Sequence, residues 1–269
     1  MKFDLHCHTK EGSFDSRIPI SEYICKYKIL GYDGFMITDH NSYRGCMKSR
    51  NVAVPDGFTV LRGIEYDTKD AGHVLIVLPD GVYPYVLRIR GMRLSKLTGL
   101  VHHLGGVIGL AHPFGIPSSS AMGFKLMKMD YIEDLDFIEI FNTCEKEISN
   151  KLARELADKF NLPGIGGTDA HDGKYIGSAY TEIDYNIKNN NDFIEAIVKR
   201  AHIEVVGKER ERTRRDRLKD MWFSQLGYRL YNRGLSKAKM PHRKLSHKNL
   251  LKHRPHSKHW SLRQKQESD

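Results

Sequence analysis

The sequence predicts an α/β fold in which about seven strand–helix units close into a (βα)7 TIM-like barrel. Short apolar runs of buried-strand type alternate with segments whose apolar residues recur at helical spacing, over roughly 206 residues. Polar residues stand where the apolar strands end, and in such barrels that edge carries the active site. A doubly wound open sheet also binds ligands at its strand ends and is the alternative fold.

The first predicted strand, residues 3–8, aims two imidazoles at one point. Strand side chains alternate between two faces, so His6 and His8 point the same way. Two converging neutral imidazoles make half of a site for a transition metal. Apolar residues at helical spacing then predict a helix over 20–30 that Gly31 ends.

The remaining elements are predicted in the same way. Apolar runs indicate strands at 34–38, 60–64, 74–78, 107–111, 137–141, 180–183 and 203–206, with a further segment at 162–167. Helical spacing indicates helices over 94–104, 148–160 and 193–198. The polar residues at or just past the strand ends are His40, Glu65, His112, Asn142, Asp169 and His171.

Composition indicates a globular protein with free thiols. Hydrophobic residues make up 40% of the 269, which is compatible with a packed core. The first residues lack the apolar run of a secretory signal, and the longest aliphatic stretch, at 74–78, cannot span a bilayer. The four cysteines show neither CxxC spacing nor the density of a disulfide scaffold. We therefore expect a soluble, cytoplasmic protein.

The net charge of +10 is unevenly distributed along the chain. Residues 207–269 hold 19 Lys and Arg against 6 Asp and Glu, so residues 1–206 are mildly acidic. We expect a barrel over 1–206, a basic amphipathic helical extension over 207–240 and a basic disordered tail over 241–269. Interleaved basic and aromatic residues there can bind nucleic acid. A solvated tail with weak attraction to any polyanion is the competing interpretation.

Metal-ligand residue types recur through the predicted barrel. Nine of them are His6, His8, Asp15, His40, Glu65, His73, His112, Asp169 and His171. One such residue alone is usually structural, but this fold brings strand ends together. Burying so many imidazoles and carboxylates without a metal would cost several kcal/mol for each unpaired charge. The set favours a multinuclear metal site.

The same segments resemble the PHP (polymerase and histidinol phosphatase) domain of metal-dependent phosphoesterases. The matching motifs are Asp4 to Thr9 (DLHCHT), Ser13 to Ser16 (SFDS), Thr38 to Asn41 (TDHN), Gly63 to Glu65 (GIE), Gly72-His73, Ala111 to Pro113 (AHP) and Thr168 to His171 (TDAH). In order and spacing they cover residues 1 to about 185. The resemblance implies a distorted seven-stranded βα barrel that holds two or three metal ions.

The resemblance also implies a role for each ligand-type residue. A first metal would be held by His6, His8, Glu65 and Asp169. Glu65 would bridge to a second metal bound by His73 and His112, and a third would be bound by Asp15, His40 and His171. The residues expected to take part in catalysis are Asp39, His40, Glu65 and His171, with Asp39 as an outer carboxylate that orients an imidazole. Asn142 and Cys144 lie near the second metal without an assigned role.

Such a centre hydrolyses phosphoesters without a protein nucleophile, because metal binding lowers the pKa of water to roughly 7. Zinc, manganese and iron all suit mixed imidazole and carboxylate ligands. The phosphate would also need a fixed cation or backbone amides. The candidates are Lys10, Arg17, Arg44 and Lys174. We expect His102, His103 and His202 to be structural.

Three functions are compatible with these observations. The first is hydrolysis of a small phosphomonoester or nucleotide. The second is a nuclease or 3′-phosphatase that acts on DNA or RNA ends held by the basic tail. The third is a non-catalytic PHP protein in a nucleic-acid complex, against which the full ligand set argues. Neither the metal, the substrate nor the oligomeric state follows from the sequence.

Overall fold

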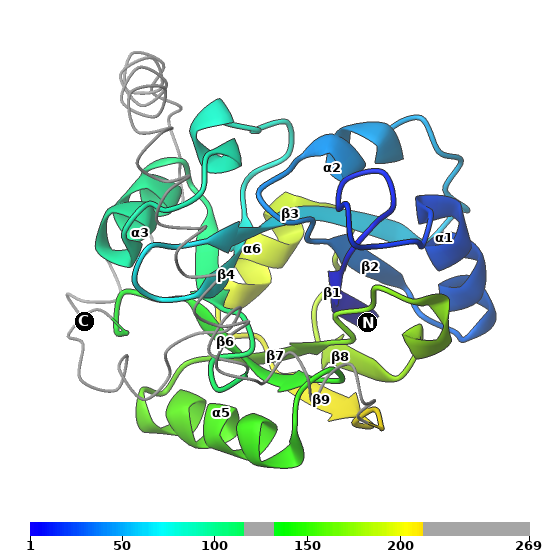
Figure 1. Ribbon diagram of the computed structural model, residues 1–269. Helices are drawn as coiled ribbons and strands as arrows, with labels where there is room; N and C mark the ends of the chain where they lie inside the picture. Colours follow the sequence, from blue (N-terminus) through cyan, green and yellow to red (C-terminus); the bar gives the residue numbers. More distant parts are fainter. Residues whose placement is uncertain (116–131, 212–269) are drawn as a thin grey trace.

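The computed structural model describes residues 1–115 and 132–211, which fold around one nine-stranded sheet (Figure 1). The strands are β1 (Lys2–Cys7), β2 (Gly34–Ile37), β3 (Thr59–Asp67), β4 (His73–Val77), β5 (Val107–Leu110), β6 (Phe137–Asn142), β7 (Gly164–Gly167), β8 (Ala179–Ile183) and β9 (Ile203–Gly207). The helices are α1 (Ile20–Ile29), α2 (Arg44–Ser49), α3 (Leu94–His103), α5 (Glu147–Lys159) and α6 (Asn190–Val198), with 3₁₀ turns η1 (Tyr85–Arg88) and η2 (Gly173–Tyr175). Apart from 207–211, the predicted basic extension and tail lie outside the described residues.

The sheet is barrel-like, but the prediction of seven parallel strands was wrong. The described strands number nine, in the order β7-β6-β5-β4-β3-β2-β1-β8-β9. β1 to β3 are parallel, as are β5 to β7, whereas β4 is antiparallel to both of its neighbours. β8 is antiparallel to β1 and to β9. The predicted number of strand–helix units was wrong because no helix separates β3 from β4 and because β8 is antiparallel to both β1 and β9.

β4 runs against β3 because residues 68–72 are too few for a crossover. A parallel connection needs a dozen residues or more. Here the Thr68 N–H donates to the Gly72 carbonyl at 2.9 Å and closes a tight turn. Asp67 therefore pairs with His73 across the hairpin. The reversal puts the first residue of β4 at the edge where β3 ends, beside the polar residues of the other strand ends.

The sheet nearly closes where β7 approaches β1. Oδ1 of Asp4 accepts hydrogen bonds from the backbone N–H groups of Thr168, at 3.0 Å, and His6, at 3.1 Å. The Asp169 N–H donates to the His6 carbonyl at 2.8 Å. Gly167 permits this approach, since a Cβ there would lie 2.5 Å from the Cβ of His6. Hydrogen bonds to the buried carboxylate of Asp4 therefore replace part of the backbone pairing that would join β7 to β1 in a regular sheet.

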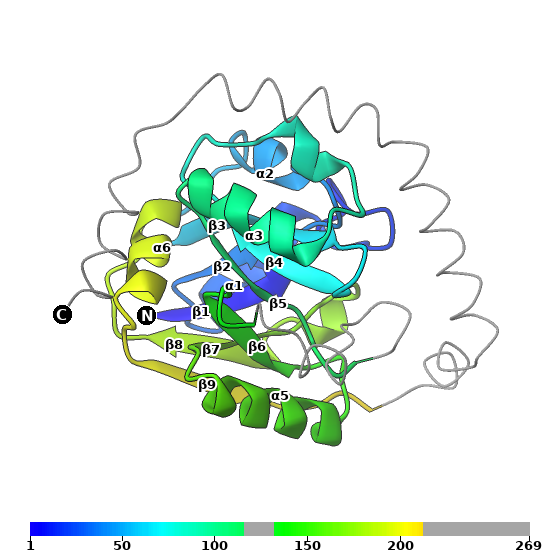
Figure 2. The same cartoon turned by 90° about the vertical axis from the view of Figure 1, so that its left-hand side faces the viewer.

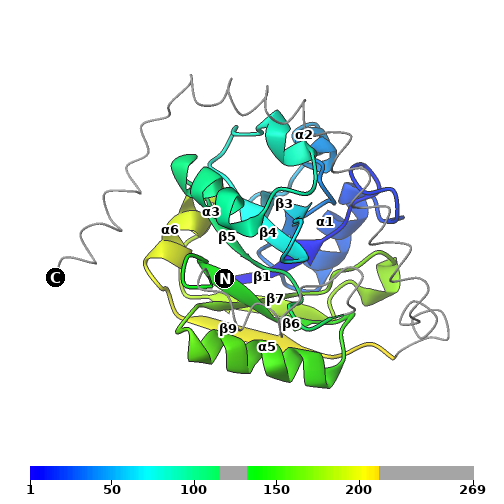
Figure 3. The ribbon, with the colours of Figure 1, turned by 60° about the vertical axis from the view of Figure 1, so that its left-hand side comes forward.

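Two apolar clusters form the core, on opposite faces of the strands. Phe35 and Ile37 of β2 pack with α1 and α3 in the first, whereas Met36 belongs to the second, which includes Phe193 and Ile194 of α6. Helix α5 lies along the side of the sheet formed by β6 and β9 (Figure 2 and Figure 3). Within 1–115 and 132–211 no helix has the length and apolar character that a membrane span requires.

Candidate metal centre

All nine predicted ligand residues converge at one edge of the sheet. They come from β1 and the loop after it, the ends of β2 and β3, the start of β4, and the segments after β5 and β7. Within the described residues, four groups of side chains have ligand atoms within 4.8 Å of one another, namely His6–Glu65–His112, His40–Glu65–His73, His6–His8–Asp169 and His8–His40–His171. Asp15 joins the last group.

Glu65 is the centre of the arrangement and is fully buried. Its Oε1 lies 2.7 Å from Nδ1 of His73 and 2.9 Å from Nε2 of His112. Its Oε2 lies 2.8 Å from Nδ1 of His40 and 3.3 Å from Nε2 of His8. Despite this proximity Oε2 has no well-aligned hydrogen bond. One carboxylate therefore faces imidazoles from four segments of the chain.

The carboxylate of Asp169 lies close to the imidazoles of His6, in β1, and of His8, just after it. Its Oδ1 lies 3.0 Å from Nε2 of His8 and 3.6 Å from Nε2 of His6. The two Nε2 atoms lie 3.2 Å apart. Asp169 has a positive φ of 50°, as does His112 with 29°, and a positive φ is uncommon outside glycine. The backbone turns sharply at these strand ends, and the side chains point into the site as a result.

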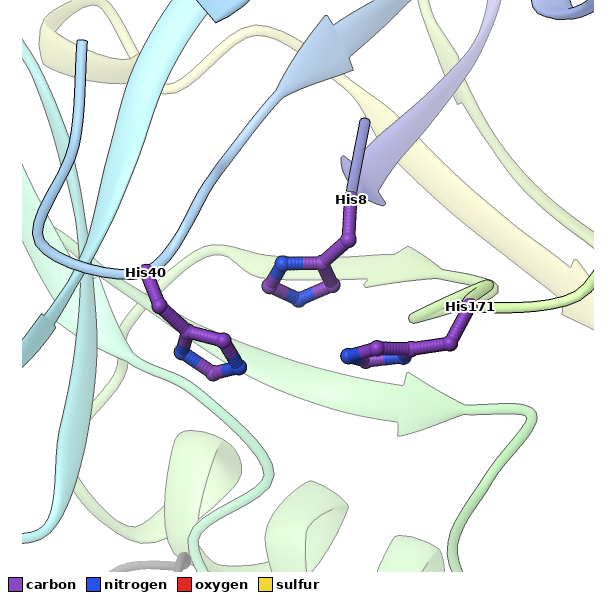
Figure 4. Close-up of side chains that lie close together, drawn as sticks. All are labelled: His8, His40 and His171. Atoms are coloured by element: carbon purple, nitrogen blue, oxygen red, sulfur yellow. The ribbon is translucent and has the colours of Figure 1, made fainter. Parts of the chain in front are cut away.

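The third group lies on the more open side of the centre. Figure 4 shows the imidazoles of His8, His40 and His171 facing one shared space. Oδ2 of Asp15 lies 3.5 Å from Nε2 of His40 and 3.4 Å from Nε2 of His171. The side chains of Asp15 and His171 are 34% and 32% exposed, whereas that of His8 is fully buried. Solvent reaches the centre from this side.

The donor set fits divalent transition metals. Imidazole nitrogens and carboxylate oxygens converge in groups of three, the usual number of protein ligands at an open metal site. Burial, together with His171 and His40 nearby, lowers the pKa of His8 to about 3, so this imidazole is neutral and can act as a ligand. The unaligned Oε2 of Glu65 is a buried acceptor that a cation between it and its neighbours would satisfy.

Asp39 is linked by hydrogen bonds to the imidazole of His8, which is not its neighbour in the chain. Oδ1 of Asp39 accepts hydrogen bonds from the Thr9 N–H at 2.7 Å and the Ser13 hydroxyl at 3.0 Å. The Ser13 oxygen lies 3.2 Å from Nδ1 of His8. Burial raises the pKa of Asp39 to about 6, against these hydrogen bonds. Its link to the imidazoles therefore runs through Ser13 to His8.

Three buried acids next to the centre were missed at the sequence level. Glu139 lies 2.9 Å from Nδ1 of His6, and Asp67 lies 3.0 Å from Nε2 of His73. Asp4 accepts a hydrogen bond from the Thr168 N–H where β7 approaches β1. A signal existed for Glu139, because it is an acidic residue within the apolar run FIEIF. Asp67 gave no comparable signal, since its partner depends on the β3–β4 hairpin.

The four phosphate-binding candidates, Lys10, Arg17, Arg44 and Lys174, all lie exposed. The backbone N–H of Arg17 donates to the His171 carbonyl at 3.3 Å, which places Arg17 at the open side. Nζ of Lys174 lies 4.8 Å from the centroid of the Tyr175 ring.

The side chains without an assigned role, and those expected to be structural, also have described surroundings. The Asn142 amide lies 3.3 Å from Oδ2 of Asp169, and Sγ of Cys144 lies 3.3 Å from the Asp169 carbonyl. His102 pairs with Asp136 at 2.9 Å. His103 on α3 and the exposed His202, which pairs with Glu204 at 3.2 Å, belong to none of the four ligand groups.

Comparison with known proteins agrees with this geometry. Residues 4–113 match the family model described as PHP domain, and residues 147–201 match the model described as PHP-associated. Among curated proteins, the uncharacterized protein MJ1587 of Methanocaldococcus jannaschii is 26% identical over 174 residues, which are 59% of this chain and 95% of that protein.

Solved structures share the fold at low sequence identity. PsfC of Pseudomonas syringae has a TM-score of 0.58 and 16% identity, over 87% of this chain and 98% of that one. A two-domain Bacteroides vulgatus protein, described as containing a predicted PHP-like metal-dependent phosphoesterase, has a TM-score of 0.57 and 17% identity, over 84% of this chain and 69% of that one. Endonuclease Q, in complex with a 27-mer duplex that has an abasic lesion, has a TM-score of 0.56 and 15% identity, over 77% of this chain and 60% of that one. The two family models together span residues 4–113 and 147–201 and show that the chain belongs to the PHP domain family.

Proposed function

We propose that this protein is a metal-dependent phosphoesterase that hydrolyses a small phosphomonoester or nucleotide, with water as the nucleophile. The observation that supports this most strongly is the position of Glu65. Its two carboxylate oxygens each face two imidazoles, so one residue can bridge two cations. When bound there, divalent metal ions lower the pKa of water to roughly 7 and offset the charge of phosphate oxygens.

The proposed ligands follow the three groups of the family. His6, His8, Glu65 and Asp169 would hold one ion, Glu65, His73 and His112 a second, and Asp15, His40 and His171 a third. The group His6, His8 and Asp169 supports the first set. For the third set, Oδ2 of Asp15 lies 3.5 Å from His40 and 3.4 Å from His171, although these two imidazoles also group with His8 of the first set. His73 and His112 both approach Oε1 of Glu65, in support of the second set. Zinc, manganese and iron all suit these donors.

The exposed side of the centre, where Asp15 and His171 lie, indicates where a substrate would enter. Asp15 and His171 are its most exposed proposed ligands, and Arg17 is held next to His171 by a backbone hydrogen bond. We propose that the phosphoester enters here, with the leaving oxygen toward His171 and a phosphate oxygen toward Arg17. Lys10, Arg44 and Lys174 are the other candidate cations. All three are exposed, and Lys174 also lies over the Tyr175 ring.

A substrate panel tests this function. The full chain, loaded with Mn²⁺ or Zn²⁺, is incubated with p-nitrophenyl phosphate, mononucleotides, histidinol phosphate and labelled oligonucleotides. We expect phosphate release from the small esters that is lost in the Glu65→Gln variant. Glu204→Gln, which changes an exposed carboxylate paired with His202, is the control and keeps full activity. No turnover of any substrate by metal-loaded protein would contradict the proposal.

A nuclease or 3′-phosphatase is the second candidate, and two observations favour it. Endonuclease Q, whose fold this chain shares, was captured on a DNA duplex. The basic surplus of residues 207–269 would supply the salt-dependent phosphate contacts that a polymer substrate needs. End-trimming of oligonucleotides that weakens when tail Lys and Arg are replaced by Gln would favour this candidate. Tight salt-sensitive binding without turnover would indicate a non-catalytic role.

A further inference from the structure

Glu139 of β6 is a buried carboxylate that no ligand group includes, yet it contacts the proposed metal centre at two points. Its Oε1 lies 2.9 Å from Nδ1 of His6, and both side chains are fully buried. Its Oε2 accepts a hydrogen bond from the backbone N–H of His112 at 2.7 Å. The same oxygen accepts a 3.2 Å hydrogen bond from the side-chain amide of Asn142.

The contact with His6 selects which nitrogen of that imidazole faces the centre. A carboxylate can only accept, so the proton of the ring lies on Nδ1. In the neutral ring, which is the form that binds a metal, the other nitrogen, Nε2, then has its lone pair toward the site, 3.6 Å from Oδ1 of Asp169 and 3.7 Å from Oε1 of Glu65. Glu139 therefore fixes both the tautomer and the direction of the His6 ring.

Asn142 extends the influence of Glu139 to a third proposed ligand. Its amide nitrogen lies 3.2 Å from Oε2 of Glu139 and 3.3 Å from Oδ2 of Asp169. The backbone of Asn142 is itself held by Asn150 of α5, whose side chain accepts from its N–H at 3.0 Å and donates to its carbonyl at 3.2 Å. The pair Glu139 and Asn142 thus joins β6 to ligands on three other segments.

We propose that Glu139 is a positioning residue that sets the metal affinity of the centre by orienting His6 and, through Asn142, Asp169. This inference rests on the proposed metal centre but not on the phosphoesterase activity. Partners in this position typically change metal affinity by about 10–100-fold when they are removed. Metal binding can be measured without any substrate, so the inference and the proposed reaction fail separately.

Asp136, immediately before the same strand, offers a matched control. It is also a buried acid that accepts from a histidine ring, His102 at 2.9 Å, and from a backbone N–H, that of Ile108 at 2.8 Å. The full-length wild type, Glu139→Gln and Asp136→Asn are compared by Zn²⁺ competition against a fluorescent chelator. We expect Glu139→Gln to bind Zn²⁺ at least tenfold more weakly and Asp136→Asn to stay within twofold of wild type. Equal affinities for all three, or an equal loss in both variants, would overturn the proposal.

A spectroscopic readout separates positioning from a general loss of stability. In ¹⁵N-histidine NMR of the Zn²⁺-loaded protein, the His6 ring is expected as a single tautomer protonated at Nδ1. Glu139→Gln should produce a mixture of tautomers or exchange broadening at His6, with His102 unchanged. If Glu139→Gln does not fold, Asn142→Ala removes the amide that joins Glu139 to Asp169, together with the acceptor of the Cys144 N–H, and should weaken Zn²⁺ binding about threefold to tenfold. Unchanged binding by that variant would count against the proposal.

Discussion

Oδ1 of Asp4 accepts a 3.0 Å hydrogen bond from the backbone N–H of Thr168, across the seam where β7 meets β1. Two residues after Asp4 is His6, and the residue after Thr168 is Asp169, so the seam also sets the spacing of two proposed metal ligands. Closure of the sheet and assembly of the centre therefore depend on one buried carboxylate.

Replacing Asp4 should destabilise the fold in a graded way. Asp4→Ala leaves the Thr168 N–H and the hydroxyls of Thr168 and Tyr27 without their acceptor, and should lower the free energy of unfolding by about 3 kcal/mol. Asp4→Asn should cost only about 1 kcal/mol, because both hydroxyls can rotate to accept from the new amide. Urea denaturation of both variants measures the difference. Equal losses would contradict this account, and the exposed Asp56→Asn serves as the control.

Glu65→Gln should abolish activity while leaving a folded chain. The amide has one acceptor oxygen in place of two, so it cannot face both His73 and His40 as the carboxylate does. We expect kcat/KM for the best substrate of the panel to fall by at least about 10³-fold, which corresponds to about 4 kcal/mol. Metal content, measured by elemental analysis of the purified variant, should fall with it. Full metal content with full activity would refute the central role of Glu65.

Metal binding should stabilise the protein more strongly as the pH rises. Burial lowers the pKa values of His6 and His73, but nearby carboxylates, Glu139 and Asp169 for His6 and Glu65 for both, outweigh burial and raise them above 6.5 in the metal-free fold. The stability that these bound protons contribute is complete below pH 6.5 and is lost as the pH rises through the raised pKa values.

Because a metal ion must displace those protons, its binding becomes tighter over the same range. Thermal unfolding at pH 6 and pH 8.5, with and without excess Zn²⁺, measures this. At a free metal concentration 100 times Kd the stabilisation is about 2.7 kcal/mol, and it grows as Kd falls. Because Kd is lower at pH 8.5, we expect a larger rise in Tm there than at pH 6. A rise that is the same or smaller at pH 8.5 would contradict the expectation.

The strands and the convergence of ligands were accessible from the sequence because both depend on local patterns. Apolar runs ending in His or Asp gave the β2, β5 and β7 ends directly. The antiparallel placement of β4 was not accessible, since it follows from a turn at 68–72 whose length matters more than its residue types. The pairing of Glu139 with His6 joins positions 133 apart in the chain, and only the folded sheet brings them together.

Two helical glycines should respond to alanine with opposite signs. Alanine normally stabilises a helix relative to glycine by roughly 0.5–1 kcal/mol. Gly99 of α3 is exposed and a Cβ there meets nothing within 4 Å, so Gly99→Ala should raise the free energy of unfolding by about that amount. At Gly45 of α2 a Cβ would lie 2.0 Å from Oδ2 of Asp39 and 2.5 Å from the hydroxyl oxygen of Thr9.

Gly45→Ala must therefore displace Asp39, and overpacking of this kind costs about 1–3 kcal/mol. Because Asp39 bonds Ser13, which contacts His8, the displacement should also weaken Zn²⁺ binding, whereas Gly99→Ala should leave it unchanged. Urea denaturation and chelator competition on the two variants measure both effects. If Gly45→Ala proved as stable as Gly99→Ala and bound Zn²⁺ as tightly, the packing of α2 against Asp39 would have no part in shaping the centre.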